Sequence, residues 1–236
     1  LDGNAKETRW VLTAASSEYM VGRFDGKVFT PETAKLKGHR GKGFYAAQTF
    51  SDIPAADGRR IMIGWLQTPS PGMAFNQSMS VPLELKLLTT PDGPRLSYMP
   101  VKELQGLQDE LRKSGPVELR TGEDPLADVK GNLLEIHLQF KPDHPKIGLI
   151  VHGASIRFEG GTWNIAGQKV TAPTRDGKQK LTLLVDRNSM EAFLGDGLVY
   201  VPFPFIAKDG DQSLHVTVEG GAAKLDSLEV HTLKSS

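Results

Sequence analysis

The stretches Gly43-Phe-Tyr-Ala-Ala-Gln-Thr-Phe50 and Arg60-Ile-Met-Ile-Gly-Trp-Leu66 decide the fold of this chain. Both contain the aromatic and β-branched residues that strands prefer, and the polar segment between them carries Pro54 and the dipeptide Asp57-Gly58. This pattern predicts a long-looped antiparallel hairpin from Gly43 to Leu66. Its aromatic and amide residues lie near the strand ends, where a rigid sheet can present them to a ligand.

The same pattern of short strands and turns extends on both sides of the hairpin. Tyr19–Phe24 and Lys27–Thr30 are separated by Asp25-Gly26, a strong signal for a tight antiparallel turn. From Val81 to Leu87 apolar and polar residues alternate, which predicts a strand with one buried face. The first hundred residues are therefore expected to be β-structure.

The character of the sequence changes after Pro100. Four apolar residues follow at helical spacing among charged and amide residues, namely Val101, Leu104, Leu107 and Leu111. This spacing predicts a short helix or helical linker, which Ser114-Gly-Pro116 would end. We therefore expect one unit over residues 1–98, a linker over 99–113 and a second unit over 114–236.

The second unit also carries the period of strands. Leu134, Ile136, Leu138 and Phe140 alternate with polar residues, and short β-prone runs separated by Gly, Asp and Pro continue to Leu233. No helical pattern interrupts them, which argues against a parallel sheet with crossover helices. The expected fold class is all-β, with a two-sheet sandwich in this unit.

Charge and composition exclude several classes of partner. The 236 residues hold 28 Lys and Arg against 28 Asp and Glu, so no excess of positive charge favours nucleic acid or an anionic membrane surface. Cysteine is absent, which excludes disulfides, thiolate metal sites and a cysteine nucleophile. No run of about 18 apolar residues occurs, so no membrane span is predicted.

The sequence offers no pattern for a metal or a cofactor. Its six histidines lack the i, i+4 helical spacing or the His-x-His strand spacing of zinc sites. Its glycines fall singly or in pairs, so no Gly-rich phosphate loop is present. We expect neither a metal nor a cofactor.

Asp186 and Glu191 form the most tempting pair of carboxylates for glycosidic bond hydrolysis, which needs two such groups about 5–10 Å apart. Along an extended strand their offset places them on opposite faces, unless Arg187-Asn188 makes a turn. Turn and surface carboxylates greatly outnumber catalytic ones, so a structural role is the favoured interpretation.

Aromatic and amide residues gather in and after the hairpin, a mixture that suits carbohydrate. The residues are Tyr45, Trp65 and Phe75 with Gln48, Asn76 and Gln77. The alternative is that strand aromatics such as Phe44, Phe50 and Trp65 are simply core. The two interpretations are nearly balanced on sequence alone.

Three runs resemble the last propeller blade of glycoside hydrolase family 32, which holds levanases, inulinases and invertases. They are Phe44–Phe50, Gly58–Trp65 and Gly72–Leu85. Leu184-Val-Asp-Arg-Asn-Ser-Met-Glu-Ala-Phe193, followed by Gly195-Asp-Gly197, resembles the Val-Asp-Arg-Ser-Ser-Val-Glu-Val-Phe signature of that family's C-terminal sandwich.

The resemblance implies a five-bladed β-propeller followed by a β-sandwich, and retaining hydrolysis of fructosyl linkages. This chain would hold part of the penultimate blade, the last blade and the sandwich. The family's catalytic motifs, Asn-Asp-Pro-Asn, Arg-Asp-Pro and Glu-Cys, are absent, and the only Asp-Pro is Asp124-Pro125. We therefore expect no catalytic residue here and no activity of the chain alone. A noncatalytic carbohydrate-binding module, or a structural or oligomerisation module, is the alternative.

By the same resemblance Tyr45, Trp65, Phe75 and Asn76 lie near the sugar-binding funnel, although many members have Trp-Arg at the position of Phe75-Asn76. The expected ligand is a fructose-containing oligo- or polysaccharide. The expected protein partner is the set of missing N-terminal blades, or another copy of the chain. The resemblance favours an extracellular or periplasmic location, while no secretory segment precedes the fold.

Overall fold

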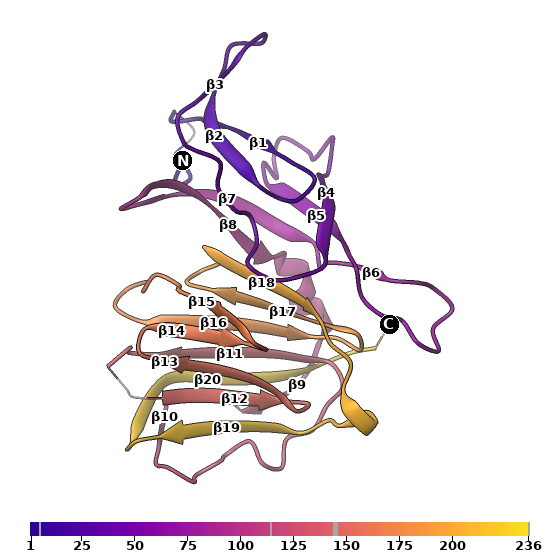
Figure 1. Ribbon diagram of the computed structural model, residues 1–236, viewed down its shortest axis with the longest axis vertical. Coiled ribbons are helices and arrows are strands. Elements are labelled where there is room, and N and C mark those ends of the chain that lie inside the picture. The colour runs from indigo at the N-terminus through magenta and orange to yellow at the C-terminus, as the bar shows by residue number, and fades with distance from the viewer. Residues whose placement is uncertain (5, 114, 144–145, 236) are drawn as a thin grey trace.

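The computed structural model describes residues 1–4, 6–113, 115–143 and 146–235 of the chain. Within these ranges the chain is all-β, with two short 3-10 helices as its only helices (Figure 1). Neither helix of this described part has the length and apolar character needed to cross a membrane.

The N-terminal region consists of two antiparallel sheets. The first holds β1 (Trp10–Thr13), β2 (Tyr19–Phe24) and β3 (Phe29–Pro31) in chain order. The second holds β4 (Phe44–Thr49), β5 (Arg60–Leu66), β7 (Leu83–Thr90) and β8 (Gly93–Pro100) in that order, and β6 (Ser78–Met79) pairs with β5. The predicted hairpin is confirmed as β4 and β5.

A β-bulge shapes this hairpin. Tyr45 lies opposite Trp65 and Gln48 lies opposite Ile63, so β4 has one more residue than β5 between the two pairs. The backbone of Ala46 has a φ of 48°, a left-handed conformation that the bulge requires. The register places Tyr45 and Gln48 on the same face of the sheet, although an offset of three residues would place them on opposite faces of a regular strand.

The segment after β8 differs from its prediction. Lys102–Leu107 forms η1, a 3-10 helix, and Gln108–Lys113 forms β9, which pairs with β20. The expected helix is therefore wrong beyond Leu107. Val101 is buried and Leu104 packs against the apolar cluster of the N-terminal region, but Leu107 and Leu111 are 39% and 51% exposed. The second half of the stripe therefore has no core to face, whereas the edge of β20 offers backbone partners for a strand.

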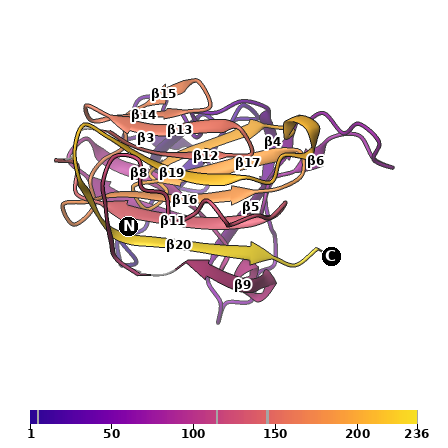
Figure 2. The same ribbon diagram turned by 90° about the horizontal axis from the view of Figure 1, so that it is seen from below.

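The C-terminal region is a sandwich of two antiparallel sheets (Figures 1 and 2). One sheet has the order β10 (Val117–Leu119), β20 (Ala223–Leu233), β11 (Leu134–Phe140), β16 (Gln179–Val185), β17 (Ser189–Leu194) and β18 (Val199–Pro204), with β9 also on β20. The other has the order β15 (Gln168–Val170), β14 (Thr162–Ile165), β13 (Ala154–Glu159), β12 (Lys146–Val151) and β19 (Leu214–Glu219). A short 3-10 helix, η2 (Lys208–Gly210), lies between β18 and β19.

A large apolar core fills the space between these sheets. Its aromatic centre is formed by Phe140, Phe158 and Trp163, whose ring centroids lie 5.2 to 5.8 Å apart. The Trp163 indole N–H donates to Oε1 of Gln179 at 2.8 Å, so its polar atom is satisfied in the core. The alternation predicted for Leu134–Phe140 places its apolar residues in this core.

The N-terminal region packs on the outer face of the larger sandwich sheet. Leu184, Phe193 and Tyr200 point away from the sandwich core and join a second cluster with apolar residues of β2, β4, β5, β7 and β8. Every residue of β17 is consequently buried. The backbone N–H of Arg40 donates to the Tyr200 carbonyl at 2.7 Å, which adds a backbone bond to this shared core. The two regions thus share one interface.

Candidate functional site

Two aromatic side chains form an exposed pair on the hairpin. Tyr45 of β4 and Trp65 of β5 are 44% and 37% exposed, and their ring centroids lie 6.4 Å apart at an interplanar angle of 70°. Gln48 is exposed on the same face. Phe44 points to the opposite side and is only 3% exposed. The core interpretation is therefore right for Phe44 and wrong for Trp65 and for Phe50, which is 45% exposed.

The aromatic surface continues onto β6 and the loop before it. Met79 lies opposite Trp65 in the strand register and is 53% exposed. Phe75 is 58% exposed and Asn76 is also exposed, in the loop that joins β5 to β6. Tyr45, Trp65 and Met79 lie opposite one another across β4, β5 and β6. We call this set the aromatic row after its two rings, with the thioether side chain of Met79 at its end. No ring contact in the described part of the chain joins Phe75 to this row.

Asn188 of the sandwich holds the base of that loop, a role that the sequence analysis did not identify. Asn188 is 4% exposed, and its Nδ2 donates to Thr68 Oγ1 at 3.0 Å. Its Oδ1 accepts from Ser78 Oγ at 3.2 Å. The signal was a polar residue in a predicted turn, but only the fold shows that the turn reaches the loop carrying Phe75 and Asn76.

The predicted turn at Arg187-Asn188 is confirmed between β16 and β17. The Asp186 N–H donates to the Ser189 carbonyl at 2.9 Å, and the Asp186 carboxylate accepts from the Arg187 N–H at 2.7 Å. Asp186 is exposed at this turn. Its carboxylate therefore serves the local turn geometry.

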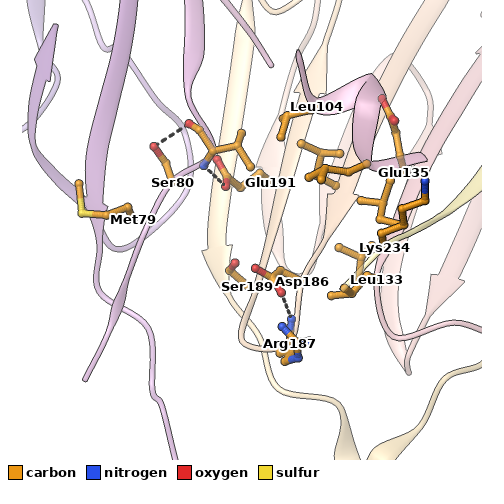
Figure 3. A pocket seen from close by; sticks show the side chains of 15 residues that line it. Met79, Ser80, Leu104, Leu133, Glu135, Asp186, Arg187, Ser189, Glu191 and Lys234 are labelled. Atoms are coloured by element: carbon orange, nitrogen blue, oxygen red, sulfur yellow. Dashed lines mark hydrogen bonds between the residues drawn. The ribbon is translucent and has the colours of Figure 1, made fainter. Parts of the chain in front are cut away.

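A cavity of about 290 Å³ lies between this turn, the strand end at Met79 and the apolar side chains of η1 (Figure 3). Asp186, Glu191 and Glu135 reach its wall, together with Arg187 and Lys234. The carboxylate pair considered for catalysis thus lies at the interface of the two regions rather than in the aromatic row.

Glu191 is fixed by hydrogen bonds inside that interface. It is 3% exposed, and it accepts from the Val81 N–H at 2.9 Å and from the Tyr200 hydroxyl. Burial raises the pKa of Glu191 to about 7, against the lowering effect of these two donors, and the charge of Asp186 adds to the rise. Both carboxyl oxygens of Glu191 are therefore engaged by partners within the interface.

Two further carboxylates are also occupied by structural partners. Nε2 of Gln108 donates to Glu135 at 2.8 Å, and a ring nitrogen of His137 lies 3.0 Å from the same carboxylate. Burial by itself would raise the pKa of Glu135, but these two bonds hold it below its usual value. Asp124 accepts from the Leu126 N–H at 3.0 Å and lies 2.8 Å from His215. The only Asp-Pro of the chain is therefore part of a loop in the sandwich region.

Within the described ranges the structure shows no cluster of side chains that could bind a metal ion. No group of three or more His, Asp or Glu side chains gathers there as a metal would need.

Comparison with known proteins assigns the N-terminal region and the sandwich to the same family. Residues 5–100 match the glycosyl hydrolases family 32 N-terminal domain, and residues 154–232 match the glycosyl hydrolases family 32 C terminal. Together these two matches cover well over half of the chain. The chain belongs to glycoside hydrolase family 32.

Relatives within family 32 are longer than this chain. A levanase of Bacillus subtilis is 30% identical over 99% of this chain and 41% of its own length. A sucrose-6-phosphate hydrolase of Zymomonas mobilis is 28% identical over 92% of this chain and 47% of its own length. The chain thus spans less than half the length of these two curated relatives.

Solved structures of family 32 share the fold. An exo-inulinase of Aspergillus awamori superposes with a TM-score of 0.83 at 17% identity, over 98% of this chain and 55% of that one. A fructofuranosidase of Schwanniomyces occidentalis, complexed with fructosylnystose, superposes with a TM-score of 0.72 at 18% identity, over 99% of this chain and 58% of that one. These similarities concern the fold.

Proposed function

We propose that this chain is the C-terminal part of a retaining glycoside hydrolase that acts on fructans or sucrose-type sugars. The observation that carries the proposal is the match of both family 32 domains, in order, to a fold that leaves Tyr45 and Trp65 exposed side by side. Flat aromatic faces beside amide groups suit the C–H surfaces and hydroxyls of a sugar. Tyr45, Trp65, Phe75 and Asn76 would form one wall of the substrate funnel.

In this proposal residues 1–98 are the last blade and part of the preceding blade of a five-bladed propeller, and residues 114–236 are the sandwich. The linker over 99–113 is not a free tether, because β9 within it pairs with β20. Support for the propeller comes from the N-terminal sheets. Tyr19 and Val21 of the first sheet join the same cluster as Phe44 and Leu83 of the second, as stacked blades would.

The outer face of the first sheet supports the proposed partner. It carries Trp10 at 57% exposure, Leu12 at 51% and Phe24 at 38%, and the Trp10 and Phe24 rings lie 5.2 Å apart. An exposed apolar sheet face of this kind is expected to be covered by another protein surface. We propose that the missing N-terminal blades cover it, and that another copy of the chain does so when they are absent.

We further propose that the chain alone is inactive. A retaining glycosidase needs two carboxylates flanking the scissile bond, one as nucleophile and one as acid and base. The family motifs that would carry them are absent from the sequence, while Glu191 is buried against Tyr200 and Asp186 belongs to a turn. The catalytic groups would lie on the blades that precede this chain in its relatives.

An activity assay separates the parts of this proposal. The chain alone should release no fructose from levan, inulin or sucrose, and co-expression with an N-terminal segment bearing the three catalytic motifs should restore release. Fructose release by the chain alone would overturn the claim of inactivity. The coding sequence upstream of Leu1 gives a second test, because the proposal expects Asn-Asp-Pro-Asn, Arg-Asp-Pro and Glu-Cys in frame.

The substrate wall is tested in the complementing pair. Trp65→Ala should raise KM for the fructan, because it removes an aromatic face of the wall. Phe50→Ala is a matched control, since Phe50 is 45% exposed but follows the far end of β4. Equal effects of both changes would remove Trp65 from the site.

A noncatalytic carbohydrate-binding module is the second candidate, favoured by the exposed Tyr45 and Trp65 pair in a chain without the catalytic motifs. Calorimetric titration with levan, inulin and sucrose tests it. Absence of heat for all three sugars would leave only a structural or oligomerisation role for the isolated chain.

A further inference from the structure

A second hollow, of about 470 Å³, opens where the N-terminal region meets the sandwich. Three segments line it, Ser16–Glu18, Lys37–Gly41 and Gln168–Val170 of β15. None of them carries a residue of the aromatic row or of the cavity around Glu191. Because both regions contribute, the hollow forms only when they pack together.

Positive charge dominates the lining of this hollow. Lys37, Arg40 and Lys169 line it, and none of them forms an ion pair with a residue that the structure describes. Glu18 is the one carboxylate of the lining, and it is already paired with Lys35 at 3.1 Å. Three uncompensated cations around one hollow repel each other and attract an anion.

Two buried hydroxyl groups without partners lie close to Gly38, one of the residues that line the hollow. Ser17 is 3% exposed and Tyr98 is 2% exposed, and neither hydroxyl has a hydrogen-bond partner among the described residues. A Cβ at Gly38 would lie 2.8 Å from each hydroxyl oxygen and 2.2 Å from the Ser17 carbonyl, so only glycine permits this approach.

His39 adds a further polar group. Its Nδ1 is buried without a partner, and burial, followed by the nearby charges of Arg40 and Lys37, holds the pKa of His39 below its ordinary value. The positive field of the hollow therefore already acts on this ring. A bound anion would oppose that field.

We propose that this hollow binds the phosphate group of a small ligand. The guanidinium group of Arg40 and the ammonium groups of Lys37 and Lys169 line one hollow, and such groups recognise phosphate oxygens. The volume is sufficient for a sugar phosphate as well as for free phosphate. The sequence shows no phosphate loop, and this site is of another kind, since its donors are side chains of three separated segments.

Isothermal titration with inorganic phosphate tests the proposal, with sodium chloride at equal ionic strength as the reference. We expect saturable binding, weakened roughly tenfold by Arg40→Gln and by Lys169→Gln, because each removes a charge-assisted bond. Lys208→Gln should leave binding unchanged, since Lys208 is exposed on η2 and does not line the hollow. No saturable heat, or an equal loss with Lys208→Gln, would overturn the proposal.

A second titration distinguishes the two sources of phosphate. Tighter binding of glucose 6-phosphate than of inorganic phosphate identifies a sugar phosphate, equal binding identifies the free anion, and binding of neither contradicts the proposal. NMR titration of His39 gives an independent readout. Phosphate should raise the pKa of His39 in the wild-type chain, and Arg40→Gln should need roughly ten times more phosphate for its own change. An unchanged pKa in the wild-type chain would contradict the proposal.

Discussion

The sandwich and the three-stranded sheet β1–β3 are both antiparallel and rich in aromatic residues, but they differ in what covers them. Trp163 is fully buried between two sheets, whereas Trp10 is 57% exposed on a face that none of the described residues covers. The outer face of β16–β18 shows a third case, because the N-terminal region covers it with apolar residues. The comparison shows that the sandwich buries its aromatic residues between two sheets, whereas the outer face of β1–β3 leaves Trp10 and Phe24 exposed.

The largest effect is expected from substituting the two tryptophans, because one is buried and the other exposed. We expect Trp163→Ala to lower the free energy of unfolding by about 3–5 kcal/mol, because it leaves a cavity in the core and removes the bond to Gln179. Trp10→Ala should lower it by less than about 1 kcal/mol. Urea unfolding of both variants measures the difference. Similar losses would mean that β1–β3 is as tightly packed as the sandwich.

The pH dependence of stability tests the role of Glu191 at the interface between the two regions. Its pKa is raised from 4.5 in the unfolded chain to about 7, so its contribution to stability is fully present below pH 4.5 and is lost as the pH rises to about 7. The loss is on the order of 3 kcal/mol, from about 1.4 kcal/mol for each pKa unit. Glu191→Gln should therefore flatten the fall in unfolding free energy between pH 4.5 and about 7.

The control for this experiment is Glu159→Gln, which changes an exposed glutamate of β13. It should keep the wild-type pH dependence. An unchanged slope in Glu191→Gln would show that this carboxylate does not control the interface in that range of pH.

The outer face of β1–β3 should affect association more than stability. Leu12→Lys places a charge on that face and should shift the isolated chain toward monomer, as measured by light scattering over a range of concentrations. Leu111→Lys is the matched control, because both leucines are 51% exposed but Leu111 lies on β9. A stable, monodisperse wild-type monomer would count against the proposed partner surface.

The smallest effect is expected in the loop between β5 and β6. Phe75 is 58% exposed, so Phe75→Ala should change the free energy of unfolding by less than about 0.5 kcal/mol. Urea unfolding of this variant checks it. A loss above about 2 kcal/mol would show that Phe75 packs against the fold rather than facing a ligand.

Local pattern was a sound guide wherever one face of a strand packs on a core. The alternation in Leu134–Phe140 and the turn residues around Arg187-Asn188 predicted the structure that is observed. The helix predicted from the spacing of residues 101–113 is wrong after Leu107, because these residues pair with the edge of β20. Local helix propensity carries no information about such a distant backbone partner. The exposure of Trp65 was open for the same reason, since a strand aromatic is buried or exposed according to what covers its face.

By itself the sequence determined the all-β fold, the hairpin from Gly43 to Leu66 and the resemblance to family 32, because each depends on residues close together along the chain. Only the tertiary structure decided which faces are covered. It pairs Tyr45 with Trp65 in the open, buries Glu191 against Tyr200, and assembles a cationic hollow from three distant segments. These features depend on long-range packing, and the period of a strand does not record which surface will lie against it.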